Sequence, residues 1–203
     1  MATEGEAAGA LEAVILAAGA GSRFGGAKLT APWRGGLLID GALAAAFAAP
    51  ARQVTVVIGA DPRVETAARA FAEGRGESGR LRIVHAADHA QGMAASLRAG
   101  LASLPGDSGG AFVFLGDMPR IPPAVPPLLA QALATGALAA APVFGGRRGH
   151  PVLFARALFD GLSALAGDLG ARSLLASLGD GLVLVDSRDA GVLYDVDDPS
   201  DLI

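Results

Sequence analysis

The sequence predicts an α/β domain in which helices cover both faces of a mostly parallel sheet. Short apolar runs, several of them rich in valine and isoleucine, alternate along the 203 residues with alanine-rich segments of helical length. Turns rich in glycine and proline separate these segments. No linker and no fixed repeat divides the chain, so we expect one domain over residues 1–203.

The first half of the chain reads as strand, helix, strand, helix. Residues 12–18 form an apolar run that ends in glycine, which is typical of a short buried strand. Residues 38–49 have the alanine content of a helix, and Pro50 marks its end. Residues 53–58 are rich in β-branched side chains and predict a strand, and the turn at 59–62 starts a helix of about ten residues.

The pattern continues after a polar, glycine-rich connection at residues 74–80. We expect a strand over 81–85 and a helix over 92–104. Residues 111–115 form the next buried strand. Several prolines then crowd the start of a helix that we expect over 126–135.

The last third of the chain completes the alternation. Further strands are expected at 138–143, 151–154 and 182–185, and further helices over 155–165 and 171–178. In such sheets, ligands bind outside the carboxyl ends of the strands. The loops that follow the first strand and the strand at 111–115 should therefore face one cleft.

The composition excludes several classes of function. The 52 % of hydrophobic residues and 18 % of charged residues argue against disorder, and no run reads as a membrane span. The absence of cysteine excludes disulfides, thiolate catalysis and cysteine-based zinc sites. The net charge is −4 and the arginines are scattered along the chain, which argues against a basic surface that binds nucleic acid. The N-terminus is acidic where a secretory signal needs positive charge, so we expect a cytoplasmic protein.

The loop after the first strand carries the strongest chemical pattern, because it holds the only lysine among 16 basic residues. Glycines in such a loop let backbone N–H groups converge on phosphates, and a lysine and an arginine add positive charge. The alternative is a solvated loop whose lysine has no special task. The residues that we expect to bind a nucleotide triphosphate here are Leu16, Ala17, Ala18, Gly19, Gly21, Ser22, Arg23, Gly25 and Lys28.

Two familiar nucleotide-binding motifs fit this loop poorly. A dinucleotide site needs a helix directly after the glycines and then an acidic residue. Asp40 lies at a suitable distance, but the proline and two glycines within 32–36 leave no room for a crossover helix before it. A P-loop needs Gly-Lys-Ser/Thr, whereas Ala27 precedes Lys28 and Leu29 follows it.

Three carboxylates are candidate metal ligands. Asp117 follows a buried strand and should face the glycine-rich loop, where a carboxylate could hold Mg²⁺ together with substrate phosphates. Its alternative role is to cap its own turn. Asp195 and Asp197 alternate along an extended segment and could supply a second ligand, or they could form a solvated acidic end. Asp198 before Pro199 is explained as a helix N-cap.

Two further segments are candidates for substrate contacts. Gly92 and Ser96 open a helix that could lie along a base or a ribose. His150, in a basic turn, could contact the transferred group or the second substrate, or could simply be exposed. His85 and His89 lack metal-ligand spacing, so we expect structural or exposed roles for them.

Taken in order along the chain, these motifs resemble the molybdenum cofactor nucleotidyltransferases. The resemblance spans nearly the whole chain, and five ordered motifs are far more specific than one glycine loop. The motifs are Leu16-Ala17-Ala18-Gly19 with Arg23, Gly25 and Lys28, then Gly116-Asp117-Met118-Pro119, Gly149-His150-Pro151, Gly167-Asp168-x-Gly170-Ala171-Arg172 and Asp195-Val196-Asp197-Asp198-Pro199-x-Asp201-Leu202.

The resemblance implies a three-layer, Rossmann-like nucleotidyltransferase fold with a mostly parallel mixed sheet. It implies that the first loop binds the triphosphate, that Asp117 holds Mg²⁺, and that Arg23 and Lys28 act on the phosphates. Leu-Ala-Ala-Gly resembles the cytidylyltransferase branch, whereas guanylyltransferases more typically carry Leu-Ala-Gly-Gly. The expected substrates are therefore CTP and a molybdopterin-type acceptor, and the expected recipient is a molybdoenzyme of the xanthine dehydrogenase type or its chaperone.

Some positions depart from the family pattern and leave the second substrate open. Relatives often have Asn-Pro and a tryptophan where this chain has Ala86-Ala87 and His89, and aspartate-threonine-proline where it has Asp197-Asp198-Pro199. Three alternatives stand beside the main hypothesis. They are a non-catalytic nucleotide-binding accessory or sensor protein, a transferase that uses GTP or another phosphorylated acceptor, and a nicotinamide-dependent oxidoreductase.

Overall fold

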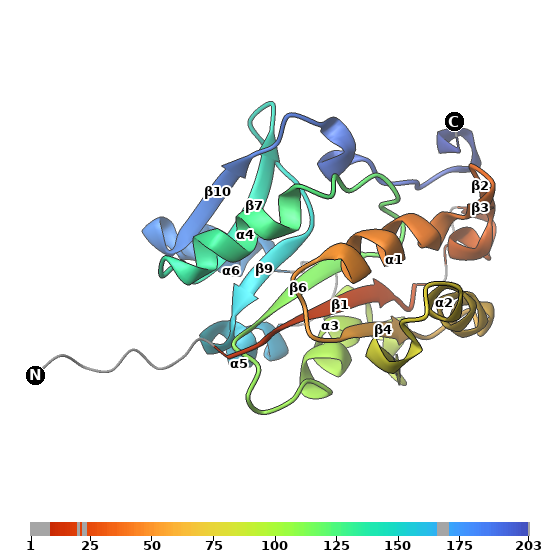
Figure 1. The fold of residues 1–203 in the computed structure, drawn as a ribbon, viewed down its shortest axis with the longest axis horizontal. Helices are drawn as coiled ribbons and strands as arrows, with labels where there is room; N and C mark the ends of the chain where they lie inside the picture. Colours follow the sequence, from red (N-terminus) through yellow and green to blue (C-terminus); the bar gives the residue numbers. More distant parts are fainter. Residues whose placement is uncertain (1–8, 20, 22–23, 166–170, 203) are drawn as a thin grey trace, which may run out of the picture.

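The computed structural model describes residues 9–19, 21, 24–165 and 171–202. An eight-stranded sheet runs through this part of the chain, with helices on both faces (Figure 1). Its strands are β1 (Leu11–Ala17), β4 (Val54–Ile58), β5 (Leu81–His85), β6 (Gly110–Leu115), β7 (Ala139–Phe144), β8 (Arg147–Arg148), β9 (Val152–Ala155) and β10 (Leu182–Asp186). The helices are α1 (Leu38–Ala48), α2 (Arg63–Gly74), α3 (Met93–Ala102), α4 (Val125–Ala134), α5 (Phe159–Ser163) and α6 (Arg172–Ser177).

The strands are arranged in the order β10-β7-β9-β6-β1-β4-β5, and β8 pairs with β7. Strand β1 lies between β4 and β6 and is parallel to both, while β4 is parallel to β5 and β10 to β7. Strand β9 runs antiparallel to its neighbours β6 and β7. The sheet is therefore mixed but mostly parallel, as the sequence predicts.

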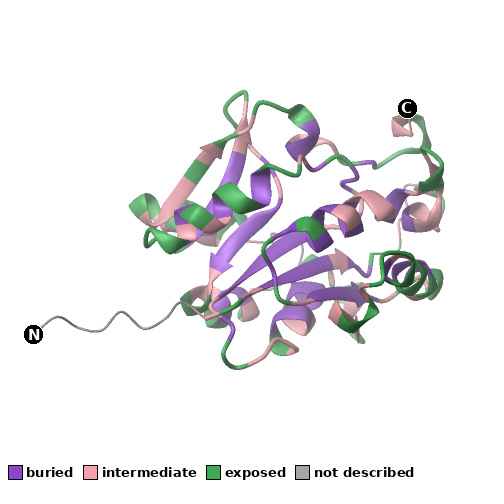
Figure 2. Cartoon of the chain, in the orientation of Figure 1, coloured by how far each residue is buried: buried purple, intermediate pink, exposed green. Residues whose placement is uncertain are grey.

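The two faces of the sheet bury two separate apolar cores. On β1, Ala13 and Ile15 face one core, which α1, α2 and α4 cover, whereas Val14 faces the other, which α3, α5 and α6 cover. Successive side chains of a strand point to opposite faces, so burial on both sides requires an apolar run without alternation. Figure 2 shows this burial concentrated in the central strands, and it confirms the three-layer architecture.

Several short elements differ from the sequence-based expectation, among them β8, which lies where a basic turn is expected. A small hairpin, β2 (Pro32–Trp33) and β3 (Gly36–Leu37), closes around a two-residue turn before α1. Its strands are too short to give a periodic signal. The helix expected over 155–165 is shorter, because Ala155 still belongs to β9 and a 3₁₀ helix (Arg156–Leu158) precedes α5.

The C-terminal segment returns from the β10 edge toward the β2–β3 hairpin (Figure 1). Two 3₁₀ helices, Ala190–Leu193 and Pro199–Asp201, flank an extended stretch. The N–H of Val196 in this stretch donates to the carbonyl oxygen of Asp117 at 3.1 Å. The end of the chain is thereby joined to the loop that follows β6. Among the described residues, no helix combines the length and the apolar character needed to cross a membrane.

Candidate functional site

The loops that follow β1 and β6 open at the same edge of the sheet. The N–H of Gly116, directly after β6, donates to the carbonyl oxygen of Leu16 near the end of β1 at 3.0 Å. Asp117 is the next residue, so its carboxylate lies beside the glycine-rich loop. The arrangement agrees with the expectation that both loops face one cleft.

Lys28 is held by the turn that it begins. The 3₁₀ helix Lys28–Thr30 buries Leu29, and the hydroxyl of Thr30 donates to Asp61 Oδ2 at 3.2 Å. Gly21 approaches the same turn closely, since a Cβ added there would lie 2.9 Å from Lys28 Cβ. Only glycine fits at that distance, and its φ of +58° also favours glycine.

The ammonium group of Lys28 joins two carboxylates that are far apart in the sequence. Its Nζ donates to Asp117 Oδ2 at 2.7 Å and to Asp197 Oδ1 at 3.1 Å, and the Lys28 side chain is only 11 % exposed. Burial by itself would lower the pKa of Lys28, but the charges and hydrogen bonds of the two carboxylates outweigh it and raise the pKa above its ordinary value. Lys28 is therefore a positively charged group at neutral pH.

A small turn at the end of the chain positions Asp197. The backbone N–H groups of Asp197 and Asp198 donate to Asp201 Oδ2 at 3.0 and 2.8 Å. Asp198 accepts the N–H of Ser200 at 3.0 Å, which agrees with its interpretation as an N-cap. Asp195 remains exposed, yet partial desolvation raises the pKa of its carboxyl, and the negative charges of Asp197 and Asp117 add to this effect.

The pair Asp117 and Asp197 fits a divalent cation. Both accept hydrogen bonds from the same Lys28 ammonium, so their oxygens lie close together. Within the described ranges, no three acidic or histidine side chains gather closely enough to hold a metal ion by themselves. Mg²⁺ typically takes one or two carboxylates and completes its coordination with phosphate oxygens and water, so a carboxylate pair is a suitable donor set.

A cavity of about 520 Å³ opens beside this cluster, within the range of small-molecule sites. The sequence-predicted residues that line it are Leu16, Ala17, Ala18, Gly19, Gly21, Lys28, Gly92, Ser96 and Asp117. The lining residues that we did not assign to the site are Leu29, His89, Ala90, Met93 and Leu115. The spacing of His89 gives no metal-ligand signal and predicts a structural or exposed role, whereas its place in the cavity depends on its packing against Gly59, which periodicity does not reveal.

The other predicted residues are not brought to the cavity, or they fall outside the described part of the chain. Gly25, Asp195 and Asp197 are not among the described lining residues, although Asp197 contacts Lys28. His150 is not among them either, and its backbone N–H donates to the Val192 carbonyl oxygen at 2.9 Å. Burial lowers the pKa of the His150 imidazole to about 4, so it is neutral near pH 7. Ser22, Arg23 and the 167–170 part of the fourth motif lie outside the described residues.

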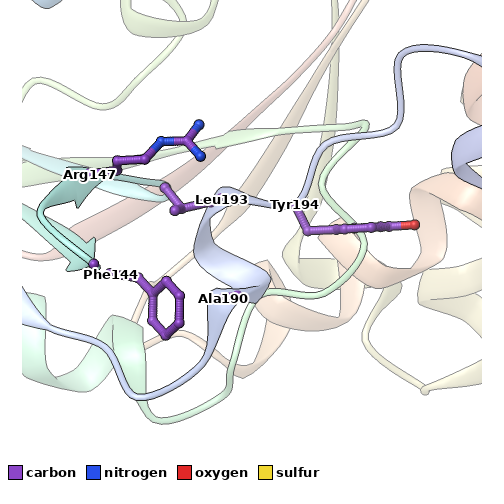
Figure 3. Close-up of a pocket in the computed structure, with 6 residues that line it drawn as sticks. Phe144, Arg147, Ala190, Leu193 and Tyr194 are labelled. Atoms are coloured by element: carbon purple, nitrogen blue, oxygen red, sulfur yellow. The ribbon is translucent and has the colours of Figure 1, made fainter.

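A second hollow, of about 370 Å³, lies on the β7–β8 side of the molecule. Figure 3 shows Phe144, Arg147 and Leu193 around it, with the Tyr194 ring extending away from them. The guanidinium of Arg120 stacks on that ring, 4.9 Å from its centroid. The described residues of this hollow include no carboxylate, so the groups that could carry metal-assisted chemistry lie in the larger cavity.

Comparison with known proteins gives a consistent result over almost the entire chain. The model of the MobA-like NTP transferase domain matches residues 13–182. A molybdenum cofactor cytidylyltransferase from Escherichia coli (strain K12) is 26 % identical over 194 residues, which cover 96 % of this chain and 94 % of that protein.

Solved structures have the same fold. Rv0371c from Mycobacterium tuberculosis H37Rv matches with a TM-score of 0.76 and 25 % identity, covering 96 % of each chain. A structure of Rv0371c in complex with manganese matches with a TM-score of 0.71 and 25 % identity, covering 89 % of each chain. A nucleotidyl transferase from Methanothermobacter thermautotroptrophicus also has this fold, with a TM-score of 0.74 and 24 % identity, covering 95 % of this chain and 94 % of that chain.

Proposed function

The chain belongs to the family of MobA-like NTP transferases and is a nucleotidyltransferase, and from this premise we propose that it transfers CMP from CTP to a molybdopterin-type acceptor. The observation that carries the proposal is the convergence of Lys28 and Asp117 at a cavity with room for a nucleotide. The choice of CTP and of the acceptor is supported by the E. coli relative, which is described as a molybdenum cofactor cytidylyltransferase, and by Ala17-Ala18 in the first loop.

The proposed reaction is a displacement at the α-phosphorus of CTP. An oxygen of the acceptor's terminal phosphate forms a bond to that phosphorus, and the bond to the oxygen that bridges toward the β-phosphorus breaks. Pyrophosphate leaves with the bonding electrons. The attacking phosphate is already anionic at neutral pH, so the reaction needs no general base, and catalysis rests on positioning and on charge stabilisation.

Lys28 and the glycine-rich loop would stabilise the charge that develops on the leaving pyrophosphate. Lys28 is a compact cation on a flexible stem, already at the cavity, and the backbone at Gly19 and Gly21 lines the same space. Arg23 is proposed to add a second positive charge from the same loop. Fixed charges of this kind act strongly because they need no reorganisation during the reaction.

Asp117 and Asp197 would hold Mg²⁺, which would supply Lewis-acid polarisation of the α-phosphate and offset the charge between two anionic substrates. The manganese complex of Rv0371c supports a divalent cation in this family. Asp195 is proposed as a further carboxylate near this cation. Its raised pKa reflects the partial desolvation and the two neighbouring carboxylates, a local field that favours a bound cation.

The remaining predicted contacts are assigned by position. Gly92 and Ser96 would lie along the nucleoside, because they line the cavity from the start of α3. His150 and Gly25 stay proposed contacts of the second substrate and of the phosphates. The proposed recipient of the product is a molybdoenzyme of the xanthine dehydrogenase type, or its chaperone.

Pyrophosphate release from a panel of CTP, GTP, ATP and UTP, each with Mg²⁺ and molybdopterin, tests the proposal. We expect CTP to give the highest kcat/KM, by about tenfold or more over each of the others. Preference for GTP would contradict the assignment to the cytidylyltransferase branch. Binding of CTP without pyrophosphate release in the presence of Mg²⁺ and molybdopterin would contradict the proposed acceptor.

Lys28, Asp117 and Asp197, here called the ion cluster, also determine how we expect the nucleotide-free protein to bind a metal ion. The Lys28 ammonium already pairs with Asp117 and Asp197, so a divalent cation must compete with it when no triphosphate offers Lys28 other partners. We expect Lys28→Met to bind Mn²⁺ about tenfold more tightly than the wild type in the absence of nucleotide. Electron paramagnetic resonance of free Mn²⁺ measures this affinity. Adding Asp117→Asn to the variant should remove the gain, whereas equal affinities of wild type and Lys28→Met would contradict the competition.

A further inference from the structure

The hydrogen bond of His89 determines which of its ring nitrogens carries a proton. His89 begins a short 3₁₀ helix, His89–Gln91, and its Nδ1 lies 3.0 Å from the carbonyl oxygen of Ala86. A carbonyl oxygen can only accept, so Nδ1 must donate. In the neutral imidazole the other nitrogen, Nε2, is then an acceptor. The protonation of the ring is thus assigned from its partner.

The His89 ring lies at the carboxyl end of β4. A Cβ added at Gly59, directly after β4, would lie 2.7 Å from His89 Cγ and 2.9 Å from Ala18 Cβ. The absence of a side chain at Gly59 is what lets the ring come this close. Cγ is the ring atom nearest to this position, and Nε2 is two bonds away from it. Within the described residues no other group bonds to Nε2, and His89 lines the large cavity.

His89, Lys28 and Asp117 all line that cavity, but His89 and Asp117 are positioned by different strands. Asp117 follows β6, whereas the His89 ring lies at the end of β4, and β1 is the only strand between them. Two strand spacings amount to about 10 Å. If the phosphates lie at Lys28 and Asp117, the ribose fits between the ion cluster and the His89 ring, and the base reaches that ring. This placement rests on the proposed function.

We propose that His89 determines base specificity by accepting a hydrogen bond at Nε2 from the exocyclic amino group of a pyrimidine base. Cytosine carries an amino donor at position 4, where uracil carries a carbonyl acceptor. Against uracil, the Nε2 lone pair faces a second lone pair, and both groups lose water without gaining a partner. A site built to accept a hydrogen bond discriminates against the analogue that lacks the donor. His89 therefore favours CTP over UTP, two nucleotides of the same size.

The test compares affinities for CTP and UTP by isothermal titration calorimetry with Mg²⁺ present. We expect the wild type to bind CTP about 30-fold more tightly than UTP. His89→Phe keeps a ring over Gly59 but removes the acceptor, and it should reduce the ratio to about threefold or less, chiefly by weakening CTP. The matched control is His85→Phe. The His85 side chain is 71 % exposed and is not among the described lining residues, so this substitution should leave the ratio unchanged.

A nucleotide without the amino group tests the same hydrogen bond by changing the ligand. The wild-type protein alone gives a result, so the test stands even if His89→Phe folds poorly. The triphosphate of the pyrimidin-2-one ribonucleoside lacks the 4-amino group of CTP. The wild type should bind it at least about tenfold more weakly than CTP, whereas His89→Phe should bind the two equally. An undiminished CTP preference in folded His89→Phe, or equal wild-type affinity for both nucleotides, would overturn the role of His89 and leave the proposed function standing. A wild type that prefers UTP or GTP would instead overturn the proposed function.

Discussion

Replacing Lys28 by alanine is expected to lower the rate of nucleotidyl transfer by about 100-fold or more. That factor corresponds to about 2.7 kcal/mol of lost transition-state stabilisation and is the usual scale for one charge-stabilising contact. The loss should appear in kcat as well as in kcat/KM, because the proposed contact strengthens as charge moves onto the pyrophosphate. Steady-state pyrophosphate release with saturating CTP, acceptor and Mg²⁺ measures it.

The structure offers two controls for this substitution. Lys28→Arg keeps the charge but replaces a compact ammonium by a broad planar fork in a pocket where the side chain is 11 % exposed, so we expect it to recover only part of the activity. Arg69→Ala removes a positive charge from the exposed surface of α2 and should leave the rate within about twofold of the wild type. Near-normal turnover of folded Lys28→Ala would rule out the role assigned to this lysine.

The sequence predicts much of the geometry around Lys28, because it depends on the sheet. The apolar runs give the central strands, and the rule that parallel strands present their carboxyl ends at one edge places the loops of Lys28 and Asp117 together. In the structure the two loops meet, and Lys28 Nζ lies 2.7 Å from Asp117 Oδ2. The sequence also argues against a dinucleotide-binding role for Asp40. Asp40 accepts the N–H of Leu37 at 2.7 Å and caps the start of α1, which is a structural role.

Other parts of the site depend on contacts that no local pattern encodes. Asp197 reaches Lys28 because a backbone hydrogen bond joins Val196 to Asp117, and the sequence alone left Asp197 open between ligand and solvated end. His89 enters the cavity because Gly59 leaves room for its ring. His150 is the opposite case. Its motif drew attention, but tertiary packing buries the imidazole and keeps it out of the described lining of the cavity.

Replacing Asp117 by alanine or asparagine is expected to abolish turnover that depends on the divalent cation, with a loss of about 1,000-fold or more. Asp117 supplies the better-placed of the two carboxylates. It lies 2.7 Å from the Lys28 ammonium with 25 % of its side chain exposed, whereas Asp197 lies at 3.1 Å with 52 % exposed. Its loss would remove a proposed metal ligand and would also leave Lys28 with Asp197 alone. We therefore expect Asp197→Asn to reduce turnover less than Asp117→Asn does.

The effect on folding should be small enough to separate from the effect on chemistry. Lys28 keeps one carboxylate partner in Asp117→Asn, so the free energy of unfolding should fall by about 1 kcal/mol, or roughly 2–4 °C in Tm, as measured by circular dichroism. Asp180→Asn, an exposed carboxylate in the turn before β10, serves as the matched control and should change neither turnover nor Tm. If folded Asp117→Ala retained cation-dependent turnover within about tenfold of the wild type, the cation would have to be held by other residues. Mn²⁺ affinity in the presence of CTP decides whether Asp117 or other residues hold the cation. This affinity falls in Asp117→Ala only if the Asp117 carboxylate is a ligand.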